Sequence, residues 1–150
     1  MDLNEFFGPN AIVVHLRAEN RWEAIDELLD HLVVHQKIKP GDKGAIGDAV
    51  RKRERSMTTA IGFEVAIPHA STDLVSEVSG IVGLSRQGVE FDSLDRKLVR
   101  IVVLFLVPHG QFQKHLHTLA NIAKLLNRRD FRDWLGGLSK NSQCQYLLMV

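Results

Sequence analysis

The sequence predicts an α/β fold in which helices flank a mixed central β-sheet. Short runs of β-branched and aliphatic residues alternate along the chain with segments whose apolar residues recur at helical spacing, which is typical of layered α/β proteins. The chain has 150 residues, 45% of them hydrophobic, which is enough for one hydrophobic core. No repeat, low-complexity segment or linker divides it. We therefore expect a single domain over residues 1–150.

The N-terminal part predicts one strand and one helix. Residues 11–16 are rich in β-branched side chains, which favours a buried strand. Asn20 followed by Glu23 resembles a capping box, in which two side chains bond to free backbone N–H groups at the start of a helix. Apolar residues at helical spacing extend this helix over about residues 21–36, and Pro40-Gly41 breaks it.

A second helix and a pair of short strands follow. Asp42 is expected to cap a helix that runs into the basic segment 51–55. Residues 57–62 and 65–67 indicate two short strands joined near Gly62.

The C-terminal half predicts two longer strands. Residues 79–84 and 98–107 are nearly continuous apolar runs, and the second has the composition of a central strand that is covered on both faces. Pro108 is expected to end it. Gln87-Gly88 marks a turn, and residues 91–97 form a polar connection between the two strands.

Helices are expected near the C-terminus. Apolar residues at helical spacing predict a helix over residues 111–127, and a short last helix is expected over 130–135. Gly136-Gly137 is expected to close it, because glycine favours helix ends. The tail 139–150 is compatible with a frayed end or with an additional strand.

Bulk properties disfavour several classes of protein. Lys plus Arg exceed Asp plus Glu by one, and no aromatic residues interleave with the basic run, so nucleic-acid binding is disfavoured. Cys144 has no second cysteine with which to form an internal disulfide. No apolar run approaches the roughly 20 residues of a membrane span, and the acidic N-terminus does not resemble a signal peptide. We expect a cytoplasmic protein with no membrane insertion.

The candidate reactive group is His69. It follows Pro68 at the end of a short apolar run, and proline cannot donate to a sheet ladder, so we expect the strand to stop there with His69 at its tip. An imidazole in such a position suits acid–base, metal or nucleophilic chemistry. A phosphorylated imidazole would need donors nearby, from a histidine at the start of the 111–127 helix and from the basic run 51–55. The simpler interpretation of that run is a solvated helix end.

Other kinds of site are weakly supported. His31 and His35 are spaced to face the same side of a helix, but no third ligand is near, so a solvated helix face is favoured over a metal site. His115 and His117 point to different faces of their helix, and only one of them can share a site with His69. Hydrolase, P-loop and dinucleotide-binding motifs are absent, and nothing suggests an organic cofactor.

The segment R-E-R-S-M-T-T-A-I-G-F-E-V-A-I-P-H-A, from Arg53 to Ala70, resembles the active-site signature of the fructose/mannitol-type enzyme IIA domains of the bacterial phosphoenolpyruvate:sugar phosphotransferase system. The nitrogen-regulatory IIA proteins are a branch of this family. The resemblance continues through G-V-E-F-D-S-L-D at residues 88–95 and H-L at residues 115–116. It covers about residues 3–136, which would be the core of the domain.

The resemblance implies a role for each matching residue. His69 would accept and donate the phosphoryl group through Nε2, His115 would help to stabilise the phosphate, and Arg53 would pair with its oxygens. Thr59 and Gly62 match positions that shape the adjacent strand and loop. No metal or cofactor is implied.

This sequence also departs from the family pattern. Glu64 stands where many members have glycine, and a carboxylate beside the phosphate would oppose phosphorylation, so we expect its side chain to point away from His69. His109 and Arg96 are further departures, and neither replaces a residue of the expected site.

The implied protein is a phosphotransferase component that receives phosphate from an HPr-type carrier protein through a shallow, partly apolar surface around His69, with Phe63 a candidate contact. Its next partner would be a regulatory target, if it is a nitrogen-regulatory IIA protein. The alternative is a sugar-specific IIA component that passes phosphate to a IIB–IIC permease. The free-standing chain favours the regulatory branch, and a IIA-like module without phosphorylation is disfavoured because His69, His115 and Arg53 occur together.

Overall fold

A mixed six-stranded sheet forms the centre of the computed structural model, which describes residues 11–140. The strand order is β1-β5-β6-β3-β2, and β4 pairs with β6 beyond the end of β3. The pairs β1–β5, β3–β6 and β4–β6 are parallel, whereas β5–β6 and β2–β3 are antiparallel, so the predicted mixed sheet is confirmed. The strands are Ile12–Val13 (β1), Ala60–Gly62 (β2), Val65–Ala66 (β3), His69–Thr72 (β4), Ser79–Val89 (β5) and Val99–Pro108 (β6).

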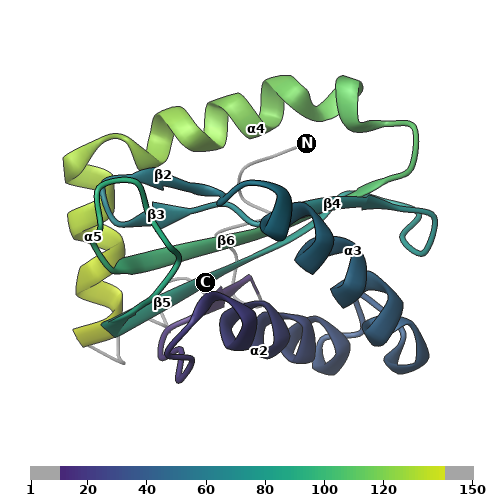
Figure 1. The fold of residues 1–150 in the computed structure, drawn as a ribbon, viewed down its shortest axis with the longest axis horizontal. Helices are drawn as coiled ribbons and strands as arrows, with labels where there is room; N and C mark the ends of the chain where they lie inside the picture. The colour runs from purple at the N-terminus through teal and green to yellow at the C-terminus, as the bar shows by residue number, and fades with distance from the viewer. Residues whose placement is uncertain (1–10, 141–150) are drawn as a thin grey trace.

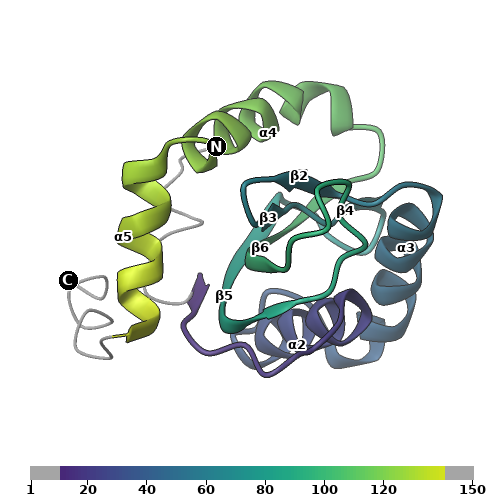
Figure 2. The ribbon, with the colours of Figure 1, turned by 60° about the vertical axis from the view of Figure 1, so that its left-hand side comes forward.

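Helices cover both faces of this sheet, as Figures 1 and 2 show. On one face a core cluster joins the sheet to α2 and α3, and on the other face a second cluster joins it to α4 and α5. The predicted α/β fold is therefore confirmed. The helices are Arg21–Val34 (α2), Lys43–Ser56 (α3), Phe112–Leu126 (α4) and Arg129–Lys140 (α5), with a 3-10 turn at Pro40–Asp42 (η1).

Strand β6 is buried on both faces, as its apolar sequence predicted. Val102 and Leu104 belong to the cluster beneath α2 and α3, whereas Val103 and Phe105 belong to the cluster beneath α4 and α5. Successive side chains of a strand point to opposite faces, so one strand supplies both cores. Pro108 is the last residue of β6 and pairs with Thr72.

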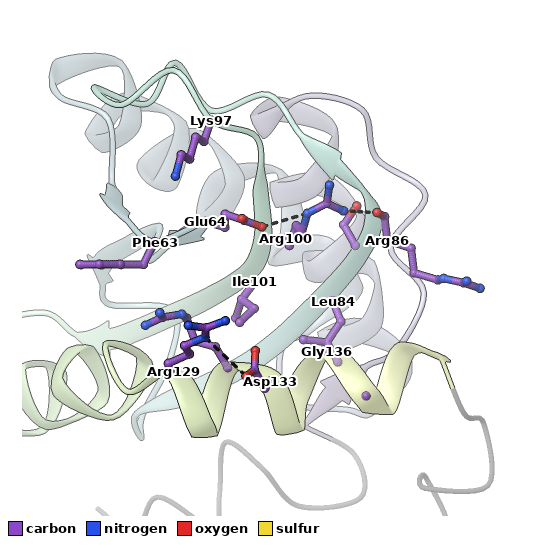
Figure 3. Close-up of a pocket in the computed structure, with 13 residues that line it drawn as sticks. Phe63, Glu64, Leu84, Arg86, Lys97, Arg100, Ile101, Arg129, Asp133 and Gly136 are labelled. Carbon is purple, nitrogen blue, oxygen red and sulfur yellow. Dashed lines mark hydrogen bonds and ion pairs between the residues drawn. The ribbon is translucent and has the colours of Figure 1, made fainter.

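The β2–β3 hairpin turns through Phe63 and Glu64. Both have positive φ, 55° and 67°, as the central residues of a type I′ hairpin turn require, although glycine and asparagine are the usual residues there. The Glu64 carboxylate lies 2.9 Å from the Arg100 guanidinium on β6 (Figure 3). The expectation that Glu64 points away from His69 agrees with this ion pair.

The start of α2 follows the capping prediction in part. Asn20 accepts a hydrogen bond from the backbone N–H of Glu23 at 3.0 Å, but the Glu23 carboxylate accepts from the N–H of Glu19 rather than from that of Asn20. Helix α2 ends at Val34, two residues before the expected end. Asp42 stands at the N-cap position of α3, as predicted, without a capping hydrogen bond from its side chain.

The strand predicted over residues 11–16 is confined to Ile12 and Val13. Leu16 is buried because its side chain packs directly against Gly83. A Cβ added to Gly83 would lie only 2.6 Å from the Leu16 side chain. The Leu16 N–H still donates to the Leu84 carbonyl of β5 at 2.8 Å, but residues 14–16 form no regular strand. A buried segment outside a regular strand leaves the same apolar pattern in the sequence as a strand does.

Two predictions based on glycine were wrong. The expected turn at Gln87-Gly88 is an irregularity within β5, where pairing with β6 shifts between Leu84 and Val89 and Gly88 has a φ of 88°. Gly136-Gly137 lies inside α5, not at its end, because two glycines weaken a helix by only about 1 kcal/mol each. Of the tail 139–150, the first two residues belong to α5, and the others lie outside the described residues.

No helix within residues 11–140 has the length and apolar character needed to cross a bilayer.

Candidate functional site

His69 is the first residue of β4, where sequence reasoning expected the tip of a strand. Strands β3 and β4 pair with β6 in one register, Ala66 opposite Val102 and His69 opposite Phe105. The Pro68 carbonyl still accepts a hydrogen bond from the Phe105 N–H at 3.0 Å. Proline therefore interrupts the strand without ending it, because β6 pairs with the chain on both sides.

The His69 ring is held by two neighbours. Its Nδ1 lies 2.8 Å from the Ile67 carbonyl oxygen, and a carbonyl can only accept, so Nδ1 carries the proton. The Phe112 ring, at the start of α4, stacks on the imidazole with 5.6 Å between the ring centroids and an interplanar angle of 23°. In the neutral imidazole Nε2 then carries the lone pair. The sequence analysis did not identify Phe112 as a site residue. The available signal was its position three residues before His115, on the same side of the expected helix.

The surroundings of His69 favour its neutral form. Burial lowers the pKa of His69 below its ordinary value of 6.5, and the positive charge of Arg53 acts in the same direction. The hydrogen bond to Ile67 and the negative charge of Glu54 oppose this shift without cancelling it. His69 is therefore an uncharged nitrogen base at neutral pH.

Arg53 is brought into the site from the last turn of α3. It is half-buried, and its guanidinium donates to the Met57 carbonyl oxygen at 3.4 Å. Its positive charge is close enough to His69 to contribute to the lowered pKa of that ring, although burial is the main cause. An arginine presents five N–H donors, so a single hydrogen bond leaves others for an anion at His69.

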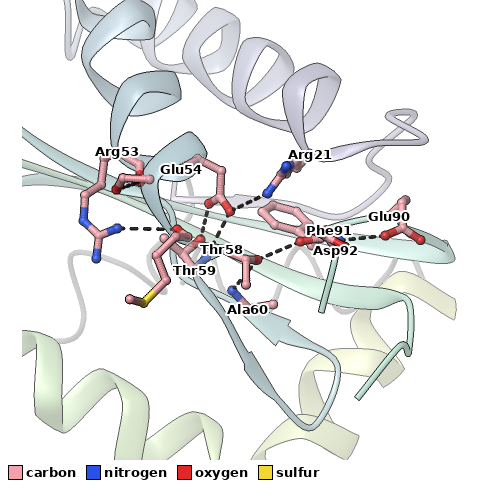
Figure 4. A network of polar contacts seen from close by, with 11 residues as sticks. Arg21, Arg53, Glu54, Thr58, Thr59, Ala60, Glu90, Phe91 and Asp92 are labelled. Carbon is pink, nitrogen blue, oxygen red and sulfur yellow. Dashed lines mark hydrogen bonds and ion pairs between the residues drawn. The ribbon is translucent and has the colours of Figure 1, made fainter. Parts of the chain in front are cut away.

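A buried carboxylate, Glu54, is connected to the site by hydrogen bonds, and Figure 4 shows its contacts with Thr59 and Arg21. Glu54 is 1% exposed and accepts hydrogen bonds from the Thr59 N–H at 3.0 Å, from the Thr59 hydroxyl at 2.5 Å and from Arg21 at 3.3 Å. The Thr59 carbonyl in turn accepts from the N–H of Ile67 at 3.1 Å. Because Ile67 binds the His69 ring, a continuous chain of hydrogen bonds links Glu54 to the imidazole.

Sequence reasoning missed Glu54. The basic run 51–55 was interpreted as a solvated helix end, which fits exposed Lys52 and Arg55 but not Glu54. The R-E pair of the family signature, which contains Glu54, was the available indication that this residue belongs to the site. Thr59, which that signature assigned to shaping the strand, is the partner of Glu54.

His115 lies one turn of α4 after Phe112, and residues at this spacing face the same side of a helix. Its side chain is half-buried, whereas that of His117 is exposed. Partial burial and the neighbouring Lys114 lower the pKa of His115. Within residues 11–140 its ring makes no hydrogen bond to His69, so its role with phosphate stays a prediction.

The His31 and His35 rings stack with centroids 6.5 Å apart at the end of α2. Within the described part of the chain, no group of three or more His, Cys, Asp or Glu side chains is placed to hold a metal ion.

Exposed apolar side chains occur on the segments that border the site. They are Met57 after α3, Ile61 on β2 and Leu116 on α4, with exposed fractions of 67%, 44% and 44%. Phe63 is also exposed, at 56%, but its ring lies under the Arg132 guanidinium of α5, 4.9 Å away.

Residues 5–148 match the family described as "Phosphoenolpyruvate-dependent sugar phosphotransferase system, EIIA 2". The chain belongs to this family. The predicted membership in the fructose/mannitol-type IIA family is thereby confirmed.

Two relatives represent two branches of the family. A nitrogen regulatory protein from Bradyrhizobium diazoefficiens is 29% identical over 150 residues, which are 100% of this chain and 95% of the relative. The fructose-specific EIIA component of the phosphotransferase system of Haloferax volcanii is 36% identical over 112 residues, 75% of this chain and 71% of the relative.

Two solved structures share the fold. The nitrogen regulatory protein IIA-Ntr from Neisseria meningitidis superposes with a TM-score of 0.81 at 23% identity, over 97% of this chain and 98% of that one. Enzyme IIA of the mannitol system of Escherichia coli, solved in complex with phosphorylated enzyme IIB, gives a TM-score of 0.64 at 20% identity, over 87% of this chain and 96% of that one.

Proposed function

We propose that this chain is a histidine phosphocarrier, which accepts a phosphoryl group on Nε2 of His69 from an HPr-type carrier protein. The observation that carries the proposal is the 2.8 Å contact between Nδ1 of His69 and the Ile67 carbonyl. It holds the proton on Nδ1 and leaves the Nε2 lone pair free for attack. The lowered pKa of His69 keeps that lone pair available at neutral pH.

The transfer step exchanges one N–P bond for another. Nε2 of His69 attacks the phosphorus of the donor's phosphohistidine, and the donor's N–P bond breaks as the new bond forms. The donor histidine leaves with the electron pair of the broken bond. The Nδ1 proton stays on His69, where the Ile67 carbonyl stabilises the positive charge that the ring acquires.

The side chains around His69 position the group and neutralise its charge. In transfers of this kind the protein contributes orientation and electrostatic stabilisation. Arg53 pairs with the phosphate oxygens, and His115 donates a hydrogen bond to them from the α4 side. Glu54 positions the imidazole through Thr59 and Ile67. Met57, Ile61 and Leu116 supply the apolar part of a small, transient docking surface for the protein partners.

We propose that the protein belongs to the nitrogen-regulatory branch and that its phosphorylation state controls binding to regulatory targets in the cytoplasm. The end-to-end match to a nitrogen regulatory protein supports this branch. A sugar-specific IIA component is the second candidate, because the fructose-specific relative has the higher identity over its matched part. Such a component passes its phosphate to a IIB protein.

The test is incubation of the chain with phosphoenolpyruvate, enzyme I and an HPr-type protein, beside a His69→Ala variant. We expect a phosphate on the unchanged chain that is stable in base and labile in acid, and none on the variant. Absence of this phosphate from the unchanged chain would refute the phosphocarrier function. Rapid transfer onward to a fructose- or mannitol-specific IIB protein would favour the second candidate over the regulatory one.

A further inference from the structure

A polar cavity lies between the β2–β3 hairpin, the adjoining ends of β5 and β6, and α5 (Figure 3). Its volume is about 790 Å³, and neither His69, Arg53 nor His115 lines it. Small-molecule sites commonly measure about 300–1,000 Å³. The cavity is therefore separate from the proposed phosphorylation site and has the size of a small organic ligand.

Cationic side chains reach this cavity from three segments, and they outnumber the acidic ones by two. The whole chain has an excess of only one positive charge, so the excess is concentrated here. The cationic side chains are Lys97 before β6, Arg100 on β6, and Arg129 and Arg132 on α5, and the acidic ones are Glu64 and Asp133. Arg86 also borders the cavity, but Figure 3 shows its guanidinium directed away from it.

The two carboxylates leave much of this positive charge without a partner. Glu64 pairs with Arg100 at 2.9 Å, and the Arg100 guanidinium also donates to the Arg86 carbonyl oxygen. Arg132 donates to the Leu126 carbonyl oxygen at 2.9 Å. Asp133 lies 3.8 Å from Arg129, which is a loose contact. Lys97 makes no ion pair with a carboxylate in residues 11–140. Lys97 and Arg129 therefore have the least neutralised charges in the cavity. Arginine guanidinium groups match the geometry of phosphate oxygens, so these two side chains favour an anion of that kind.

The remaining walls are mostly apolar or formed by glycine, with Ser85 as the polar exception. Phe63 of the hairpin provides most of the apolar surface, because Leu84 and Ile101 of the sheet are only 1% and 5% exposed. Gly136 and Gly137 line the α5 side, and a Cβ added to either would meet no atom within 4 Å. Close packing therefore does not require glycine at these positions, although each weakens the helix by about 1 kcal/mol relative to alanine. What the two glycines provide is open space along the helix.

We propose that this cavity binds a small organic phosphate. Its phosphate would contact Lys97, Arg100 and Arg129, and its organic part would lie mainly against the exposed Phe63 ring. Inorganic phosphate would satisfy the charges but would leave most of the volume and the apolar walls unused. The proposal does not depend on phosphorylation of His69.

Calorimetric titration of the full chain with pyrophosphate, fructose 1,6-bisphosphate and ADP tests it. We expect at least one of the two organic phosphates to bind more tightly than pyrophosphate, and which one binds distinguishes a sugar phosphate from a nucleotide. Arg100→Gln should weaken binding by about tenfold, as loss of one hydrogen-bonded charge pair predicts. Arg86→Gln removes the same charge from a guanidinium that is directed away from the cavity, and should weaken binding much less than Arg100→Gln does. Arg53→Gln should also leave it unchanged, because that residue belongs to the His69 site.

A second variant probes the cavity without changing any charge. The double substitution Gly136→Ala, Gly137→Ala should raise the melting temperature, because alanine favours the helix, and should weaken ligand binding, because two methyl groups enter the cavity. The proposal is overturned if no probe binds at millimolar concentration, or if pyrophosphate binds as tightly as both organic phosphates. It is also overturned if binding is lost in Arg53→Gln, or survives unchanged in both Arg100→Gln and the alanine variant.

Discussion

Replacing Glu54 by glutamine tests the buried network that positions His69. The carboxylate has no exposed surface and accepts two hydrogen bonds from Thr59 and one from Arg21. Glutamine keeps one of the two oxygens and places an NH₂ group among donors, so at least one donor loses its partner. Hydrogen bonds to charged groups contribute about 1.5–3 kcal/mol, and breaking a buried ion pair costs about 3–5 kcal/mol.

The lower part of that range applies here, because 20% of the Arg21 side chain remains in contact with solvent. We expect Glu54→Gln to lower the free energy of unfolding by about 3 kcal/mol, measured by urea denaturation with circular dichroism at neutral pH. Asp48→Asn is the matched control on the same helix. Its carboxylate pairs with Arg51 at 3.0 Å but is 80% exposed, so the expected loss is below about 0.5 kcal/mol. A loss below about 1 kcal/mol for Glu54→Gln would refute the reasoning.

Further predictions concern His69 and its neighbours. Arg53→Gln should raise the pKa of His69, measured by NMR titration, and should slow phosphoryl transfer. The control Lys52→Gln, on the same helix, should change neither quantity. An unshifted pKa in Arg53→Gln would contradict the role of Arg53. Phe112→Ala should also raise this pKa, because burial is the main cause of its depression, and a further fall would count against that cause. His115→Ala should slow transfer while leaving the circular dichroism spectrum unchanged, and equal transfer rates would exclude its role. Because the unfolded chain binds a proton at His69 more readily than the folded one, the free energy of unfolding should fall as the pH drops below about 6.5, and His69→Ala should reduce that slope.

Most of the fold could be predicted from the sequence, because strands and helices covered by a core carry a clear apolar period. The run 98–107 and the helix 111–127 correspond to β6 and α4 within about one residue at each end. Strand β4 was missed because Pro68 was taken as the end of a strand. Only the tertiary pairing with β6 shows that the ladder resumes at His69.

The candidate site was predictable where a motif marks it and not where only contacts define it. Arg53 and His69 were identified from the signature, and the structure brings them within electrostatic reach of each other. Glu54 contacts Arg21 and Phe112 contacts His69, and these contacts join distant segments, which composition and spacing do not reveal.

The most direct test of the central claim is NMR spectroscopy of the ¹⁵N-labelled protein after phosphorylation by the phosphoenolpyruvate-dependent system. Coupling of ³¹P to one ring nitrogen identifies the phosphorylated atom. We expect the phosphorus to couple to Nε2 of His69, with Nδ1 still protonated against the Ile67 carbonyl. Phosphorus on Nδ1, or on another histidine, would contradict the account.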